Sequence, residues 1–247
     1  MSDEPREEFY IGYLSNAPRN LAKLVRRICL ALFGLVVLTA ILLALGQQKL
    51  SLSVFEFQQY RDFTGLIQAQ PNPTLLVRDR NSLAQYLLVA EGKHGVNVEN
   101  FTGKNVKLKG ARIYRDGMTM IEVVGDSIEI LPTENKLDLA NEDLGNFTLV
   151  GEIVDSKCYL GVMNPGSTKV HRECAVRCIS GGIPPLFIAR DAVGNKIALQ
   201  LVSAKNEAVN QDVLDFVAEP IKITGQVSRT GEQLIFKADP KTYQRVE

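Results

Sequence analysis

One uninterrupted apolar run stands out near the start of the chain. It extends from Ile28 to Leu45 and contains no charged residue and a single polar one, Thr39. At about 1.5 Å per residue, a helix of this length nearly spans the roughly 30 Å hydrocarbon core of a bilayer. We therefore predict a transmembrane helix over residues 28–45 in preference to a buried core helix.

Basic residues flank this run unequally. Lys49 is the one basic residue that follows it closely, whereas the residues before it include Arg19, Lys23, Arg26 and Arg27. By the positive-inside rule, residues 1–27 form a cytoplasmic tail and the remainder is exported. We expect a single-pass protein of the bacterial inner membrane with periplasmic C-terminal domains. The alternative is a signal peptide cleaved after Ala44-Leu45-Gly46, but the long N-terminal region favours an uncleaved anchor.

Beyond this helix, short hydrophobic segments alternate with turn residues. The segments are alternating or fully apolar, and Gly, Asn, Asp or Pro bound them, as is typical of β-strands. They cover residues 63–67, 74–77, 86–89, 106–109, 118–124, 150–154, 186–189, 197–202, 221–224 and 234–238. Asp116-Gly117, between two of them, predicts a hairpin turn.

The strand segments form an internal repeat. Residues 101–123 match residues 216–238, with Gly110 aligned to Gly225 and Gly117 to Gly231. Each copy has five short strands and a connection before the fourth, which is the plan of an OB-fold barrel. We predict a mainly β fold in which two tandem OB-fold-like five-stranded barrels occupy residues 57–131 and 147–240. Residues 132–146 are the predicted linker.

The two copies differ in one place, between their first and second strands. Gly65 to Leu75 in the first copy corresponds to Gly151 to Leu186 in the second. The second connection therefore contains an insertion, residues 155–185, which carries three of the chain's four cysteines. Since the first barrel closes without it, and loops at this position often bind ligands, the insertion is the leading functional candidate.

The donor residues of the insertion have a spacing that supports three kinds of chemistry. They are Cys158, Met163, His171, Cys174 and Cys178. We expect a turn at Asn164-Pro165-Gly166 and a helical segment in which Cys174 and Cys178, four residues apart, share a face. The first interpretation is a disulfide from Cys158 to Cys174 or Cys178, which would add about 3 kcal/mol by the chain-entropy model.

The second interpretation is a metal site. Cys158, His171, Cys174 and Cys178 form a Cys₃His set for zinc, and Met163 in place of one thiolate would suit copper. The Cys-x₃-Cys spacing with His and Met resembles the copper sites of extracytoplasmic proteins such as the dinuclear copper domain of cytochrome oxidase and its assembly factors. Those families use cupredoxin or thioredoxin-like folds, whose patterns this chain lacks.

The third interpretation is thiol catalysis. His171, Arg172, Arg177 or Lys157 would supply the positive environment that a reactive thiol needs. The chain has no Cys-x-x-Cys motif, and Asp155 and Glu173 are the only local carboxylates for orienting the histidine.

Composition and architecture set the functional expectation. The formal net charge is zero, which argues against nucleic acid as a partner. The chain resembles uncharacterised bacterial inner-membrane proteins with one N-terminal anchor and OB-like periplasmic domains. We expect a non-catalytic subunit or assembly factor of a membrane redox or respiratory complex, held to an integral membrane partner by its helix, tail and barrels. A periplasmic copper- or zinc-binding protein and a thiol oxidoreductase are the alternatives. No catalytic residue or organic cofactor is assigned.

Overall fold

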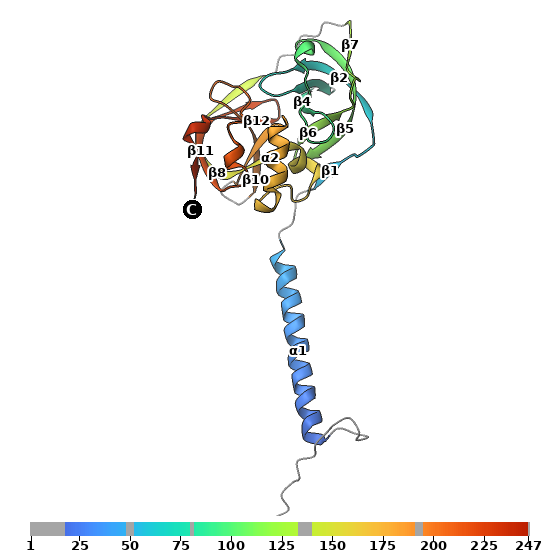
Figure 1. The fold of residues 1–247 in the computed structure, drawn as a ribbon, viewed down its shortest axis with the longest axis vertical. Helices are drawn as coiled ribbons and strands as arrows, with labels where there is room; N and C mark the ends of the chain where they lie inside the picture. Colours follow the sequence, from blue (N-terminus) through green and yellow to red (C-terminus); the bar gives the residue numbers. More distant parts are fainter. Residues whose placement is uncertain (1–17, 48–51, 80–81, 133–139, 191–194, 247) are drawn as a thin grey trace, which may run out of the picture. The chain divides into compact units, whose positions relative to one another are not determined.

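The computed structural model describes residues 18–47, 52–79, 82–132, 140–190 and 195–246 (Figure 1). A long helix, α1 (Arg19–Gly46), belongs to a unit that is separate from residues 51–247. It contains the predicted 28–45 segment, begins nine residues earlier, and buries none of its described side chains. By length and composition α1 can cross a membrane, which suits either an anchor or a signal sequence. Residues 1–17 of the predicted cytoplasmic tail lie outside the described residues.

The first barrel confirms the predicted strand plan. Its five strands are β2 (Arg61–Gln68), β3 (Thr74–Asp79), β4 (Ser82–Val89), β5 (Asn105–Arg115) and β6 (Met118–Val123). They pair in the order β5-β2-β3-β4-β6, and β5 pairs with β6 to close the sheet. The β4–β6 pairing is parallel and the others are antiparallel. Two short strands, β1 (Ser53–Phe55) and β7 (Glu129–Ile130), add to β5, and η1 (Glu99–Phe101) precedes it.

The second barrel repeats this topology. Its strands are β8 (Asn141–Asp155), β9 (Pro185–Arg190), β10 (Lys196–Val202), β11 (Ile221–Thr230) and β12 (Gln233–Lys237). The order is β12-β10-β9-β8-β11, β11 pairs with β12, and β10–β12 is the parallel pair. The chain thus has two closed five-stranded barrels. The single turns η4 (Leu214–Phe216) and η5 (Pro240–Thr242) and the strand β13 (Gln244–Arg245) complete it.

Strand β8 is longer than the segment that the sequence indicated. Its pairing with β11 extends from Asn141 to Gly151, so the strand includes residues that the sequence placed in the linker. Residues 133–139 of that linker lie outside the described part of the chain. The aligned glycines Gly65 and Gly151 play the same role in the two barrels. At each, a Cβ atom would overlap a carbonyl of the next strand, from Leu76 and Ile188 respectively.

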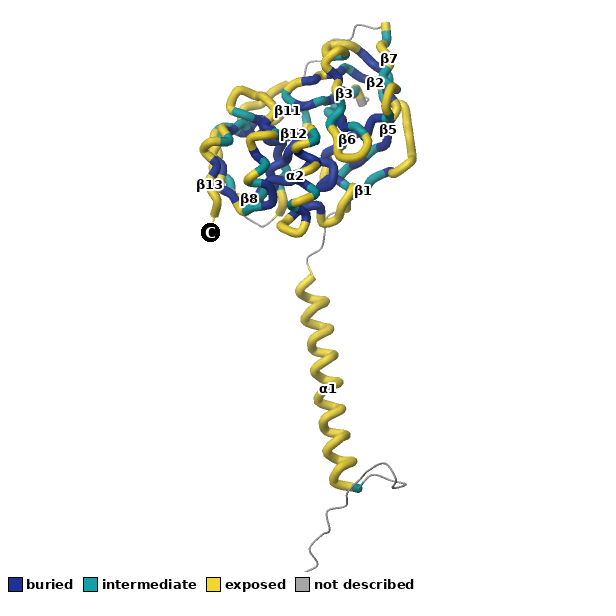
Figure 2. Tube along the Cα trace, in the orientation of Figure 1, coloured by how far each residue is buried: buried dark blue, intermediate teal, exposed yellow. Residues whose placement is uncertain are grey.

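The insertion connects β8 to β9 and packs between the barrels. It contains η2 (Cys158–Val162), η3 (Lys169–His171) and α2 (Arg172–Ser180). Besides one apolar core in each barrel, a third buried cluster joins the two. This cluster contains Leu87, Val89, Ile113, Met118 and Met120 of the first barrel and Val154, Tyr159, Leu160, Ile183, Leu186 and Ile188 of the second. On α2, Ala175, Cys178 and Ile179 are buried, and Figure 2 shows buried chain close to this helix.

Backbone groups meet directly where α2 reaches the first barrel. Gly95 donates a 2.8 Å hydrogen bond to the Gly181 carbonyl at the end of α2. A Cβ atom on Gly181 would overlap the Lys93 carbonyl, so only glycine permits this approach. At η2, the guanidinium of Arg115 from the first barrel lies 4.5 Å from the centre of the Tyr159 ring. The insertion is therefore a structural interface as well as the carrier of the cysteines.

We expect Gly181→Ala to lower the free energy of unfolding by about 1–3 kcal/mol, as overpacking of a close contact does. The φ of Gly181 is −78°, which alanine adopts freely, so the effect isolates the overlap with Lys93. Gly125→Ala is the matched control, because nothing lies within 4 Å of its Cβ position. Denaturant unfolding of both variants measures the difference, and equal stabilities would contradict the proposed tightness of this contact.

Candidate metal centre

Three thiols converge inside the insertion, and we call Cys158, Cys174 and Cys178 the thiol cluster. Cys158 begins η2, whereas Cys174 and Cys178 lie on successive turns of α2 and face it, as their spacing predicts. The Cys158 and Cys174 sulfurs are 4.0 Å apart. Cys158 and Cys178 are 4% and 1% exposed, and Cys174 is half-buried.

The histidine of the insertion completes this cluster. His171 is buried at the start of α2, and its donor atom lies within 4.8 Å of the Cys158 and Cys174 sulfurs. Its Nε2 atom is 3.0 Å from Oδ2 of Asp155, the last residue of β8. Because Asp155 engages Nε2, Nδ1 is the ring nitrogen left to bind an ion. A carboxylate that orients a histidine in this way is the usual outer partner of a metal-bound imidazole.

Asp155 also organises the turn that presents Cys158. Its Oδ1 atom accepts a 2.8 Å hydrogen bond from the Cys158 backbone N–H, and the carboxylate is fully buried. Both oxygens of one side chain therefore fix a thiol and an imidazole relative to each other. Asp155 additionally forms a compact group of donor atoms with Cys158 and Cys178. The other local carboxylate, Glu173, is exposed and lies 3.9 Å from Arg172.

The thiols of Cys158 and Cys178 have opposite protonation tendencies. The hydrogen bond between them raises the pKa of Cys158, and burial raises it further. The same hydrogen bond lowers the pKa of Cys178, since Cys178 acts as its acceptor, although burial opposes this. Cys158 therefore keeps its proton and Cys178 is the better thiolate. A cation entering the cluster would displace the Cys158 proton.

A lysine from the first barrel contacts the cluster. Lys93 lies in the loop after β4, and its Nζ donates a 3.1 Å hydrogen bond to the Cys174 sulfur. This hydrogen bond is the largest cause of the raised pKa of Lys93, which therefore remains an ammonium group. Lys93, His94, Arg177, Ser180 and Gly181 line a surface cavity of ≈ 480 Å³ beside it. A residue of the first barrel therefore contacts the thiol cluster of the second.

A second lysine anchors the same loop from the insertion side. Lys157 is buried next to Cys158 and forms an ion pair with Glu122 of β6. Its ammonium also donates to the carbonyls of Ala90 and Gly92, at 2.9 and 2.7 Å. Three acceptors from the first barrel therefore surround one buried cation, which holds the Lys93 loop against the cluster.

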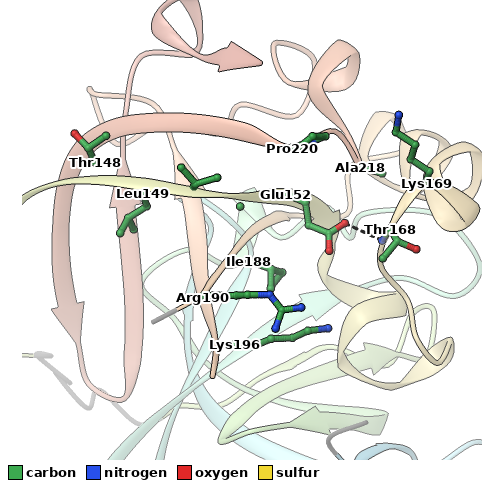
Figure 3. Close-up of a pocket in the computed structure, with 12 residues that line it drawn as sticks. Thr148, Leu149, Glu152, Thr168, Lys169, Ile188, Arg190, Lys196, Ala218 and Pro220 are labelled. Atoms are coloured by element: carbon green, nitrogen blue, oxygen red, sulfur yellow. Dashed lines mark hydrogen bonds between the residues drawn. The ribbon is translucent and has the colours of Figure 1, made fainter. Parts of the chain in front are cut away.

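A groove of the second barrel lies elsewhere (Figure 3). Its volume is ≈ 620 Å³, and strands β8, β9 and β10 supply most of its lining. In it, the Thr168 N–H donates to Glu152 at 2.8 Å, and Arg190 and Lys196 extend beneath that carboxylate. None of the predicted site residues lines this groove.

Of the five residues that the sequence selected, the structure groups His171 with Cys158 and Cys174, and it groups Cys178 with Cys158 and Asp155. Met163 is 47% exposed, and its backbone N–H bonds to the Cys158 carbonyl. All four cysteines of the chain lie among the described residues, and none forms a disulfide here. The 4.0 Å sulfur separation compares with about 2.05 Å in a disulfide bond.

Comparison with known proteins adds no assignment to this geometry. No protein-family model matches the chain, and no curated protein matches it significantly. The donor groups of the insertion are therefore the basis for any functional conclusion.

Proposed function

We propose that this protein is a membrane-anchored extracytoplasmic metal-binding protein, and that Cys158, Cys174, Cys178 and His171 bind one ion. The observation that carries the proposal is that a ring nitrogen of His171 and the sulfurs of Cys158 and Cys174 meet at one point, with Asp155 orienting the histidine. Cys178 groups with Cys158 and Asp155 immediately beside it. Soft donors with an imidazole at such a point suit zinc or copper(I).

The donor set favours zinc over copper. Three thiolates and one imidazole make the closed Cys₃His set that structural zinc adopts, with four tetrahedral ligands. Copper(I) accepts the same thiolates, but the exposed thioether of Met163 adds no support for it. The buried position between the barrels suits an ion that holds the insertion in place, because metal binding energy then adds to folding energy.

The proposed location is supported by α1 and the basic residues before it. An uncleaved α1 would leave residues 51–247 outside the cytoplasm, next to a membrane. The role as a non-catalytic subunit of a membrane redox or respiratory complex stays a prediction, and a metal site in the insertion is compatible with it.

Metal analysis of the full-length protein in detergent tests the proposal. We expect about one zinc ion per chain to remain after dialysis against a weak chelator, as for closed structural sites. Cys178→Ser is expected to lose that ion, since it removes the thiol with the lowered pKa. Cys29→Ser is the matched control, because Cys29 is an exposed thiol within α1.

Native mass measurement before and after reduction shows which results would contradict the metal-binding proposal. A chain that binds neither zinc nor copper(I) when fully reduced would contradict the proposal. A chain that gains two hydrogens on reduction and carries no ion would favour the disulfide that the sequence also allowed.

A further inference from the structure

The three thiols of the cluster differ in their access to solvent. Cys158 and Cys178 are buried, whereas Cys174 is half-buried and contacts the exposed ammonium group of Lys93. Cys174 also lies in the first turn of α2, where the helix dipole favours negative charge. An ammonium group and a helix N-terminus together are the environment in which a thiolate reacts with oxidants.

We propose that Cys174 is a modification site at which a hydroperoxide oxidises the protein, and that Cys158 then forms a disulfide with it. In the first step the Cys174 thiolate attacks the peroxide, its sulfur bonds to the distal oxygen, and the O–O bond breaks. The peroxide is reduced to hydroxide or an alkoxide, which takes a proton to leave as water or an alcohol. Cys174 is oxidised to the sulfenic acid.

The second step uses the distance between the two sulfurs. The Cys158 sulfur, 4.0 Å from Cys174, attacks the sulfenic sulfur, the S–O bond breaks, and water leaves with the Cys158 proton. Forming the bond requires the sulfurs to approach from 4.0 Å to about 2.05 Å. Burial keeps Cys158 from meeting the oxidant first.

Lys93 has two roles in the first step. Its ammonium lies 3.1 Å from the Cys174 sulfur, so it is placed to hold that sulfur by a hydrogen bond and to protonate the departing oxygen. Lys93, His94 and Arg177 line a surface cavity, so this ammonium group lies where a small peroxide from solvent can approach it. The activating group therefore comes from the first barrel and the two sulfurs from the second.

Oxidation also regulates the metal site, and this consequence rests on the proposed function. The disulfide removes the Cys158 and Cys174 thiolates, which leaves Cys178 and His171 as ligands. Two ligands do not complete a tetrahedral zinc site, so the ion is released.

The experiment treats the full-length protein in detergent with hydrogen peroxide, with and without bound zinc. Peptide mass mapping follows the Cys158–Cys174 disulfide, and a chromophoric chelator follows released zinc. We expect Cys174→Ser to form no disulfide and Lys93→Gln to slow its formation about tenfold through loss of the thiolate-stabilising charge. Lys93→Arg should restore most of the rate, and Lys205→Gln, an exposed lysine of the second barrel, is the control.

The outcomes separate this inference from the proposed function. Unchanged oxidation rates in Lys93→Gln, or a Cys158–Cys178 disulfide in place of Cys158–Cys174, would overturn the inference even if zinc binds. A chain that binds no ion but forms the Cys158–Cys174 disulfide at a Lys93-dependent rate would support the inference and refute the metal-binding proposal. Oxidation of Cys174 that stops at the sulfinic acid, with Cys158 still reduced, would also overturn it.

Discussion

Lys157→Met is expected to lower the free energy of unfolding of residues 51–247 by about 3–5 kcal/mol, the cost of breaking a buried ion pair from one side. The side chains of Lys157 and Glu122 are 4% and 9% exposed, so the variant leaves a carboxylate buried without its counter-charge. It also leaves the carbonyls of Ala90 and Gly92 without their shared donor. Denaturant unfolding of the full-length protein in detergent measures the change.

The double variant Lys157→Met/Glu122→Leu separates the ion pair from the packing around it. Removing both charges together is often neutral, because the desolvation of each charge no longer opposes folding. We therefore expect the double variant to recover most of the stability that the single variant loses. If the free energy of unfolding of Lys157→Met lies within about 0.5 kcal/mol of the wild-type value, solvent reaches Glu122, since substitutions at the surface have effects of that size.

The barrels were predictable from sequence because their signals are local. Turn glycines such as Gly117 and Gly231 adopt positive φ in both copies, and the segments between them alternate with the period of a strand. Gly65 and Gly151 mark the same close approach of strands in the two barrels. Because these glycines and strand segments occur in the same order in both copies, the same topology is expected for both barrels. The parallel pairings of β4 with β6 and of β10 with β12 agree with this expectation.

The placement of the insertion was not predictable in the same way. Its length relative to the first copy suggested a loop added to a ligand-binding face. In the structure its apolar residues, such as Tyr159 and Leu160, fill the space between the barrels. The residues that receive them, including Leu87 and Met120, occur in ordinary strands of the first barrel. The sequence of those strands does not show whether an outward-facing side chain contacts solvent or another domain.

The candidate site was predictable only in part for the same reason. The four-residue spacing of Cys174 and Cys178 gives their shared helical face directly. Asp155 was one of two candidate carboxylates, and its position at the end of β8 decides between them. Lys93 could not be found from sequence, because 81 residues separate it from Cys174 and only the packing of the barrels brings them together.

Asp155→Asn is expected to weaken zinc binding about 10–100-fold, as loss of a carboxylate behind a metal-bound histidine does. Asparagine retains the size of the side chain, and its Oδ1 atom can still accept the Cys158 N–H, so the η2 turn is kept. It removes the negative charge beside His171 Nε2 and with it the basicity that the carboxylate gives the imidazole. Competition with a chelator of known affinity measures the dissociation constant.

Glu173→Gln is the matched control, because it removes the neighbouring carboxylate, which is exposed and does not contact His171 in the described structure. An Asp155→Asn protein that binds zinc as tightly as the control would contradict the role of Asp155 in orienting the histidine. A loss well beyond 100-fold would instead indicate that Asp155 binds the ion directly, since it also groups with Cys158 and Cys178. In that case His171 would be the outer residue, and His171→Gln would have the smaller effect of the two.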